Sequence, residues 1–244
     1  MRFRFIIDRP QTLGEEIANG ISHGIGFLLA VASLPILLLF SPAHSGPLNL
    51  VAASVFSVTM MLLYGVSTLY HAWPPGRFKA WLNRCDHAAI YLFIAGSYTP
   101  FVLGVLRGGW GWSLFGVIWT MAMLGFTAKL LIAPRAGLRP ARPPRGTRKL
   151  GAARRFLENR LHHPLWSTGL YVAMGWTAVV AAAPLVARMP GAGLAWLVAG
   201  GVAYTLGAVV FLFDGRVRYA HFVWHLFVLG GSACHFVAVL RYAN

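Results

Sequence analysis

The chain has 244 residues, of which 57% are hydrophobic and only 11% are charged. This composition excludes an ordinary soluble domain, in which about a quarter of the residues are charged. The two cysteines exclude a disulfide-rich secreted scaffold. A formal net charge of +15 would suggest nucleic-acid binding in a soluble protein, but in a membrane protein we attribute it to topology.

Apolar runs of membrane-spanning length follow one another along the chain. A helix needs roughly 20 residues to cross a hydrocarbon core of about 30 Å. Seven runs meet this length, so the sequence predicts an all-α polytopic membrane protein, a seven-transmembrane helix bundle. Because the runs are continuous and do not alternate, a β-barrel is disfavoured. We expect a single domain over residues 1–244, with spans at 17–40, 48–72, 87–106, 110–132, 165–187, 194–213 and 219–240.

Basic residues are concentrated in alternate loops. All but three of the 21 Lys and Arg residues lie in the N-terminal segment or in the second, fourth and sixth loops. By the positive-inside rule, the N-terminus is expected to be cytoplasmic and the C-terminus outside. The basic loop at 133–164 is expected to lie against anionic lipid headgroups, and no nucleic-acid partner is expected.

Ionisable groups within the spans are few, and such groups are costly in a membrane and tend to be functional. In the first span, Glu16, Asn19 and His23 form a stripe at i, i+3 and i+7 that faces the bundle interior or its rim. Of the other acids, Asp8, Glu15 and Glu158 are expected to be hydrated, and Asp214 lies in an FDGR turn.

The second and third spans carry polar groups where they approach the same side of the membrane. Ser67 and His71 lie four residues apart near the end of the second span, so they share one helix face. Asp86 starts the third span, where a carboxylate can cap the helix N-terminus or take part in a site. Both interpretations are open for Asp86.

The seventh span contains HFVWH, in which His221 and His225 lie on one helix face. Two imidazoles at this spacing can reach one metal ion, although the pair alone is a weak signal. His235 lies about 15 Å further along the helix, which is too far to join the same ion. We expect it to be a buried hydrogen-bonding histidine with Ser232 or Ser97 as its partner.

Topology brings these residues into one layer, because the second span ends and the third and seventh begin on the predicted cytoplasmic side. Three histidines from two helices, His71, His221 and His225, fit Zn²⁺ with an open fourth position. Asp86 could then act as a base and Ser67 could bind a water or an oxyanion. Alternatively the zinc is structural, with Asp86 as the fourth ligand.

The segments EEIANGISHGIG, STLYHA, DHAAIYLFIAGSYTP and HFVWHLFVLGGSACHF resemble the signature segments of the hemolysin III family. This family is the bacterial branch of the progestin and adipoQ receptor (PAQR) superfamily, which includes the adiponectin receptors. The resemblance spans residues 15–236. It implies a zinc ion held by His71, His221 and His225, with Ser67 and Asp86 near the metal, and a bacterial inner membrane location.

Two functions follow from this resemblance. The receptor relatives are similar to slow lipid-amide hydrolases, so one expectation is a zinc-dependent hydrolase that cleaves a membrane lipid, such as a ceramide-type amide. The family name implies cytolysis, so the alternative is a zinc-stabilised membrane protein without enzymatic activity that forms a pore or acts as a sensor. A hydrolase should also have an apolar cavity beside the metal.

Overall fold

A computed structural model of the chain describes residues 9–40, 46–131 and 164–243. These residues form seven helical segments that are long and apolar enough to cross a membrane, and none of them forms a strand. The all-α seven-helix prediction is confirmed. The elements are α1 (Leu13–Phe40), α2 (Pro47–Ala72), α3 (Arg77–Pro100) with the π-helical turn η2 (Phe101–Val105), α4 (Gly109–Leu131), the fifth span made of α6 (Pro164–Gly175), η4 (Trp176–Ala181) and α7 (Ala182–Arg188), then α8 (Gly191–Phe211) and α9 (Ala220–Tyr242).

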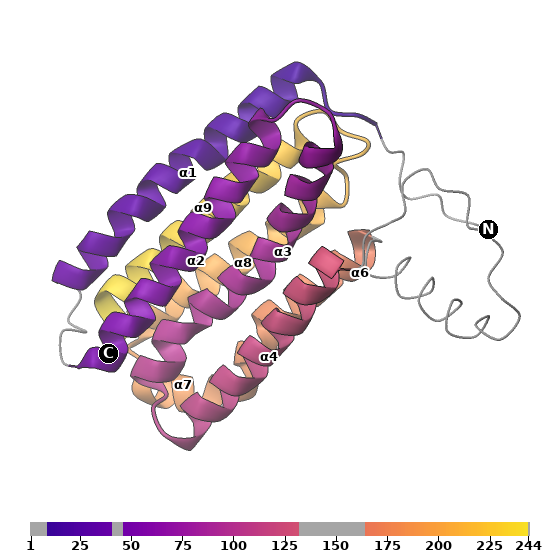
Figure 1. Cartoon of the computed structure of the whole chain (residues 1–244). Coiled ribbons are helices and arrows are strands. Elements are labelled where there is room, and N and C mark those ends of the chain that lie inside the picture. The colour runs from indigo at the N-terminus through magenta and orange to yellow at the C-terminus, as the bar shows by residue number, and fades with distance from the viewer. Residues whose placement is uncertain (1–8, 41–45, 132–163, 244) are drawn as a thin grey trace, which may run out of the picture.

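The helices pack mostly against their sequence neighbours. Figure 1 shows α1 beside α2, α2 beside α3 and α8 beside α9, and α1 also packs on α9. The contact between α1 and α9 places the first and last spans side by side in the bundle, with their starts at the same end. The starts of α1, α3 and α9 and the end of α2 lie at the same end of the bundle (Figure 1), which we call the histidine end.

Side chains are sorted as expected for a helix in lipid. On α1, Ile17, Ile21 and Ile25 are more than half exposed, while Asn19 and His23 are buried. Apolar side chains thus face the surroundings and polar side chains face the bundle, which is the arrangement that a hydrocarbon solvent favours. The first-span stripe therefore points into the bundle interior.

The third helix begins earlier than its apolar run. It starts at Arg77, whereas the hydropathy pattern places the span at 87–106. Asp86 consequently lies inside α3 and does not cap its N-terminus, so the capping interpretation is wrong. The hydropathy pattern did not include the amphipathic first turns of α3 in the span, because these turns carry Arg77, Lys79 and Arg84.

Two breaks in regular helix face each other across the third and fifth spans. Pro100 has no N–H to donate, and the π-helical turn follows it directly. One turn earlier, the Tyr98 hydroxyl donates to the carbonyl of Gly175 at 2.5 Å and accepts from the N–H of Ala178 at 2.7 Å. Tyr98 thereby satisfies backbone groups where α6 changes to the 3-10 segment η4. The π-helical turn η2 is buried in protein, which is where a membrane interior tolerates irregular backbone.

The single-domain organisation over 1–244 and the headgroup-facing loop stay predictions. Residues 132–163, which include nearly all of that loop, lie outside the described residues.

Candidate metal centre

Three buried histidines meet at the histidine end of the bundle. His71 comes from the last turn of α2, and His221 and His225 come from the first two turns of α9. One ring nitrogen from each lies within 4.8 Å of the others, and the three residues are at most 5% exposed. The cluster could therefore hold a metal ion. The sequence placed these three residues in one layer, and the structure brings them together.

Each of the three rings is held by a hydrogen bond at Nδ1. His71 Nδ1 lies 2.8 Å from Glu16 Oε2, and His221 Nδ1 lies 3.0 Å from Asp214 Oδ2. An ionised carboxylate only accepts, so both Nδ1 atoms carry the proton. Such outer partners of metal-binding histidines fix the tautomer and the ring orientation.

His225 reaches the same tautomer by another route. Its Nδ1 lies 3.1 Å from Ser22 Oγ. The Ser22 hydroxyl already donates its single proton to the carbonyl of Asn19 at 2.9 Å. Ser22 must therefore accept from His225, which makes Nδ1 the protonated nitrogen in this ring too.

The remaining nitrogen of each ring, Nε2, carries a lone pair and has no hydrogen-bond partner among the described residues. Buried polar atoms in proteins nearly always have partners, so orphaned ones require an explanation. Three unpartnered imidazole lone pairs within one cluster suit a cation, and neutral imidazole is a ligand that Zn²⁺, Cu²⁺, Fe²⁺ and Ni²⁺ accept. The donor set fits a metal ion, but it does not by itself identify which one.

Asp86 and Ser67 lie beside the histidine cluster on neighbouring helices. Asp86 is 2% exposed and interacts electrostatically with His221, and Ser67 on α2 is fully buried next to Asp86. Apart from their interaction with each other, Asp86 Oδ2 and Ser67 Oγ have no hydrogen-bond partner among the described residues. A carboxylate and a hydroxyl are thus available to a ligand that approaches the cluster. Their catalytic roles stay predictions.

Sequence reasoning missed the partners that hold the rings. Asp214 was expected to lie in a turn without a role in the site, yet it bonds His221. Glu15 was expected to be hydrated, but it is 2% exposed. Glu15 accepts from the backbone N–H of Thr12 at 2.8 Å, as in a capping box, and from that of Tyr219 at 2.9 Å. Glu15 therefore ties the start of α1 to the start of α9.

A fourth histidine belongs to the same cluster of rings. His23 stacks on His225 with ring centroids 3.4 Å apart and planes 8° apart, and its edge meets Tyr64. Both of its nitrogens lack partners among the described residues. The i, i+7 stripe with Glu16 was the sequence signal for His23, but nothing in the sequence paired it with the last helix.

His235 has a different partner from the one expected. Its Nε2 bonds the carbonyl of Leu197 on α8 at 3.2 Å. Ser232 instead bonds the hydroxyls of Tyr64 at 2.7 Å and Tyr204 at 3.1 Å, and Ser97 donates to the carbonyl of Ile94. The expectation that Ser232 or Ser97 would satisfy His235 is wrong, because those hydroxyls are already used.

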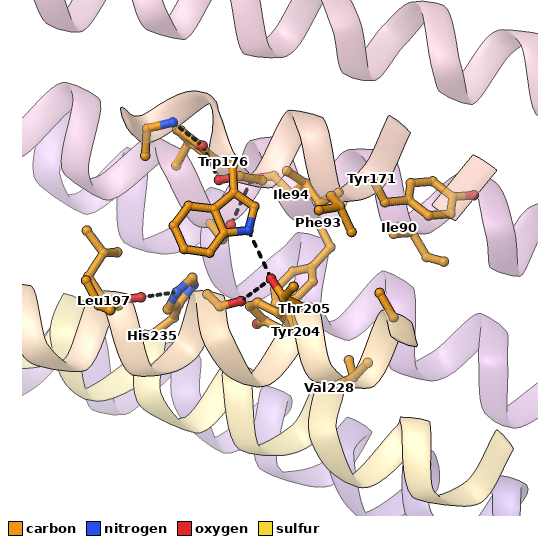
Figure 2. Close-up of a pocket in the computed structure, with 18 of the residues that line it drawn as sticks. Ile90, Phe93, Ile94, Tyr171, Trp176, Leu197, Tyr204, Thr205, Val228 and His235 are labelled. Atoms are coloured by element: carbon orange, nitrogen blue, oxygen red, sulfur yellow. Dashed lines mark hydrogen bonds between the residues drawn. The ribbon is translucent and has the colours of Figure 1, made fainter. Parts of the chain in front are cut away.

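A cavity of about 480 Å³ lies between α3, the fifth span, α8 and α9. Its walls are mainly apolar, and Figure 2 shows part of them, with Ile90, Phe93 and Ile94 on one side and Val228 on another. Asp86 and His23 line it at the histidine end. The expected apolar cavity beside the candidate metal centre is therefore present.

Comparisons with known proteins identify the family. A family model described as Haemolysin-III related matches residues 11–236, which include all the residues discussed above at the centre. The chain is 40% identical over 232 residues to Hemolysin-3 of Bacillus cereus, a match that covers 95% of this chain and 93% of that protein. The chain belongs to the hemolysin III family.

Other relatives place this hemolysin III protein in a wider group. It is 37% identical over 231 residues to the Hemolysin-3 homolog of Bacillus subtilis (strain 168), covering 95% of each chain. It is 27% identical over 202 residues to the monocyte to macrophage differentiation factor of Homo sapiens, covering 79% of this chain and 70% of that protein. The hemolysin III chain is thus a distant relative of a PAQR-family protein. Together with the seven apolar helices, these matches indicate a multi-pass membrane protein.

Proposed function

We propose that this hemolysin III protein is a zinc-dependent hydrolase that cleaves a ceramide-type amide of a membrane lipid. The observation that carries the proposal is the set of three orphaned imidazole nitrogens, each with its Nδ1 fixed, beside the buried carboxylate of Asp86 and an apolar cavity. A purely structural site would not need a lipid-sized cavity at its side.

The donor set favours zinc with an open position. Three protein ligands are the usual number in catalytic zinc sites, and structural sites usually have four. His71, His221 and His225 would hold the ion. When bound, Zn²⁺ supplies Lewis acidity toward a carbonyl oxygen and lets a water ionise near neutral pH.

The protein residues then have distinct tasks. Asp86 accepts the proton of the attacking water and returns it to the amide nitrogen that leaves, while one C–O bond forms and the C–N bond breaks. The Ser67 hydroxyl donates to the oxygen on which negative charge develops. The cavity holds the acyl chain and keeps bulk water away from the reacting groups.

We place the centre at the cytoplasmic face of a bacterial inner membrane. The support is the distribution of basic residues, which are abundant in the loops at the histidine end. In this orientation the basic loop at 133–164 contacts anionic headgroups of the same leaflet.

The alternative is a lytic pore, since two of the relatives are named hemolysins. A conducting path needs rings of charge or of backbone carbonyls. The cavity walls are mostly Leu, Val, Ile and aromatic side chains, which suit an acyl chain better than an ion. Steady conductance in reconstituted bilayers that disappears in His235→Ala would favour the pore.

The hydrolase proposal is tested by Asp86→Asn. The wild-type protein in lipid nanodiscs should release fatty acid from a long-chain ceramide, measured by mass spectrometry. Asp86→Asn should keep its metal and lose turnover by about a hundredfold to ten-thousandfold, the usual size of an acid–base contribution. Unchanged turnover in the variant would remove Asp86 from the mechanism, and no release from any lipid amide by the metal-loaded wild type would remove the hydrolase.

A further inference from the structure

His235 is a polar side chain in the cavity wall, and it lies far from the candidate metal centre. It lies ten residues after His225 on α9, which is about 15 Å along the helix axis. The side chain is buried, and its ring lines the cavity (Figure 2). Ionisable side chains at this depth in a membrane are costly and usually have a function.

The hydrogen bond to Leu197 decides which nitrogen of His235 is free. A backbone carbonyl only accepts, so Nε2 carries the proton. A neutral imidazole has one N–H, which leaves a lone pair on Nδ1. No ion pair among the described residues involves His235, so nothing there would stabilise a charged ring. Nδ1 is therefore an acceptor, and it has no partner among the described residues.

Other polar groups around His235 are already satisfied. The Trp176 N–H donates to Thr205 at 2.9 Å, and Thr205 donates to the carbonyl of Gly201 (Figure 2). The hydroxyls of Tyr98 and Tyr204 are also bonded. Among the polar atoms of the residues that line this part of the cavity, His235 Nδ1 is thus the one that still needs a donor.

The remaining orphaned atoms of the cavity wall lie at the histidine end. They belong to His23, Asp86 and Thr168. Thr168 lies about one turn before Tyr171, whose hydroxyl bonds the carbonyl of His87, the neighbour of Asp86. The cavity therefore has a polar end, an apolar middle and one isolated acceptor.

The ring of His235 is held in place by its surroundings. A Cβ at Gly200 would collide with the ring, so the close approach of α8 depends on glycine at this position. Tyr204 contacts the ring edge to face, with centroids 5.2 Å apart. A fixed acceptor of this kind can select among ligands, because a buried polar group that finds no partner is penalised.

We propose that His235 Nδ1 accepts a hydrogen bond from a hydroxyl group on the hydrocarbon chain of the lipid in the cavity. The hydroxyl would lie about 15 Å from the metal centre, as the helix spacing indicates. The preferred ligand is then a lipid with a chain hydroxylated part-way along its length. The assignment of this ligand rests on the proposed function in one respect, namely that the carbonyl end of the lipid lies at the metal centre.

The test is a binding titration that needs no turnover. Purified protein in nanodiscs is titrated by calorimetry with octadecanoic acid and with isomers hydroxylated near the carboxyl group, mid-chain and near the methyl end. The wild type should bind the mid-chain isomer about threefold to tenfold more tightly than the unsubstituted acid, as expected for one added hydrogen bond. His235→Phe should abolish this preference and still bind the unsubstituted acid.

Ser97→Ala is the matched control, since Ser97 lines the cavity but is bonded to Ile94; it should keep the preference. Equal binding of all the acids by the wild type, or a preference that survives His235→Phe, would overturn the proposal. If His235→Phe fails to fold, the isomer comparison in the wild type alone decides. A mid-chain preference without hydrolysis of any lipid amide would support the role of His235 while removing the hydrolase.

Discussion

His71 on α2 and Glu16 on α1 are joined by a 2.8 Å hydrogen bond between Nδ1 and Oε2. The bond fixes the tautomer of His71 and leaves Nε2 free for an ion. Glu16 also pairs with Lys79 at 3.0 Å, so the carboxylate links three helices at the histidine end. A residue of the first span thereby orients a candidate metal-binding histidine of the second span.

Glu16→Ala should weaken metal binding. Removing the outer partner of a metal-binding histidine typically costs about tenfold to a hundredfold in affinity. The measurement is competition for zinc with a chelator of known affinity. Lys79→Gln is the control, because it removes the ion pair but leaves the bond to His71; its affinity should stay near that of the wild type. Equal affinities of Glu16→Ala and the wild type would show that the hydrogen bond from His71 to Glu16 does not support metal binding.

Asp214→Ala should reduce the stability that metal adds, since Asp214 orients His221. A ligand that binds the folded state raises its stability in proportion to the logarithm of its affinity. The variant should melt at a lower temperature than the wild type with zinc present and at nearly the same temperature with excess chelator. Gln11→Ala is the control, because it removes a 3.4 Å contact to Asp214 and the 2.7 Å hydrogen bond that Gln11 accepts from Asn19 but leaves the bond between Asp214 and His221 in place. An equal loss with and without metal would assign Asp214 a role in the turn alone.

Ile94→Trp should block the cavity without disturbing the metal. Ile94 lines the cavity, and extra volume there competes with an acyl chain. We expect lipid turnover to fall by on the order of tenfold, from the usual cost of overpacking, while metal content stays unchanged. Val58→Trp, on an exposed apolar position of α2, should retain activity. Unchanged turnover in Ile94→Trp would mean that the lipid does not use this cavity.

Much of the architecture could be predicted from the sequence because the bilayer imposes strong rules. Each span has to be apolar and of fixed length, so the seven helices can be predicted from the apolar runs of the sequence alone. The layer that holds His71, His221 and His225 follows from counting spans, since alternate loops lie on the same side. The start of α3 could not be predicted from the apolar run, because the first turn of the helix carries Arg77 and Lys79 and extends beyond the apolar region.

The partners of the histidines could not be predicted, because they depend on how helices distant in sequence rotate against each other. Ser22 bonds His225 only because α1 packs on α9. Asp214 lies seven residues before His221, but an irregular turn separates them, so helical spacing does not apply. The same limit applies to His235. Its partner is a backbone carbonyl of α8, and every residue has a backbone carbonyl, so the sequence pattern does not indicate which one is used.

Metal analysis of the purified protein tests the central claim most directly. Inductively coupled plasma mass spectrometry would compare the wild type with the double variant His221→Ala/His225→Ala. We predict about one zinc per folded wild-type chain and close to none in the variant, because the variant lacks two of the three proposed ligands. Wild-type protein that binds no zinc even after incubation with excess zinc would contradict the metal centre, and with it the proposed hydrolase.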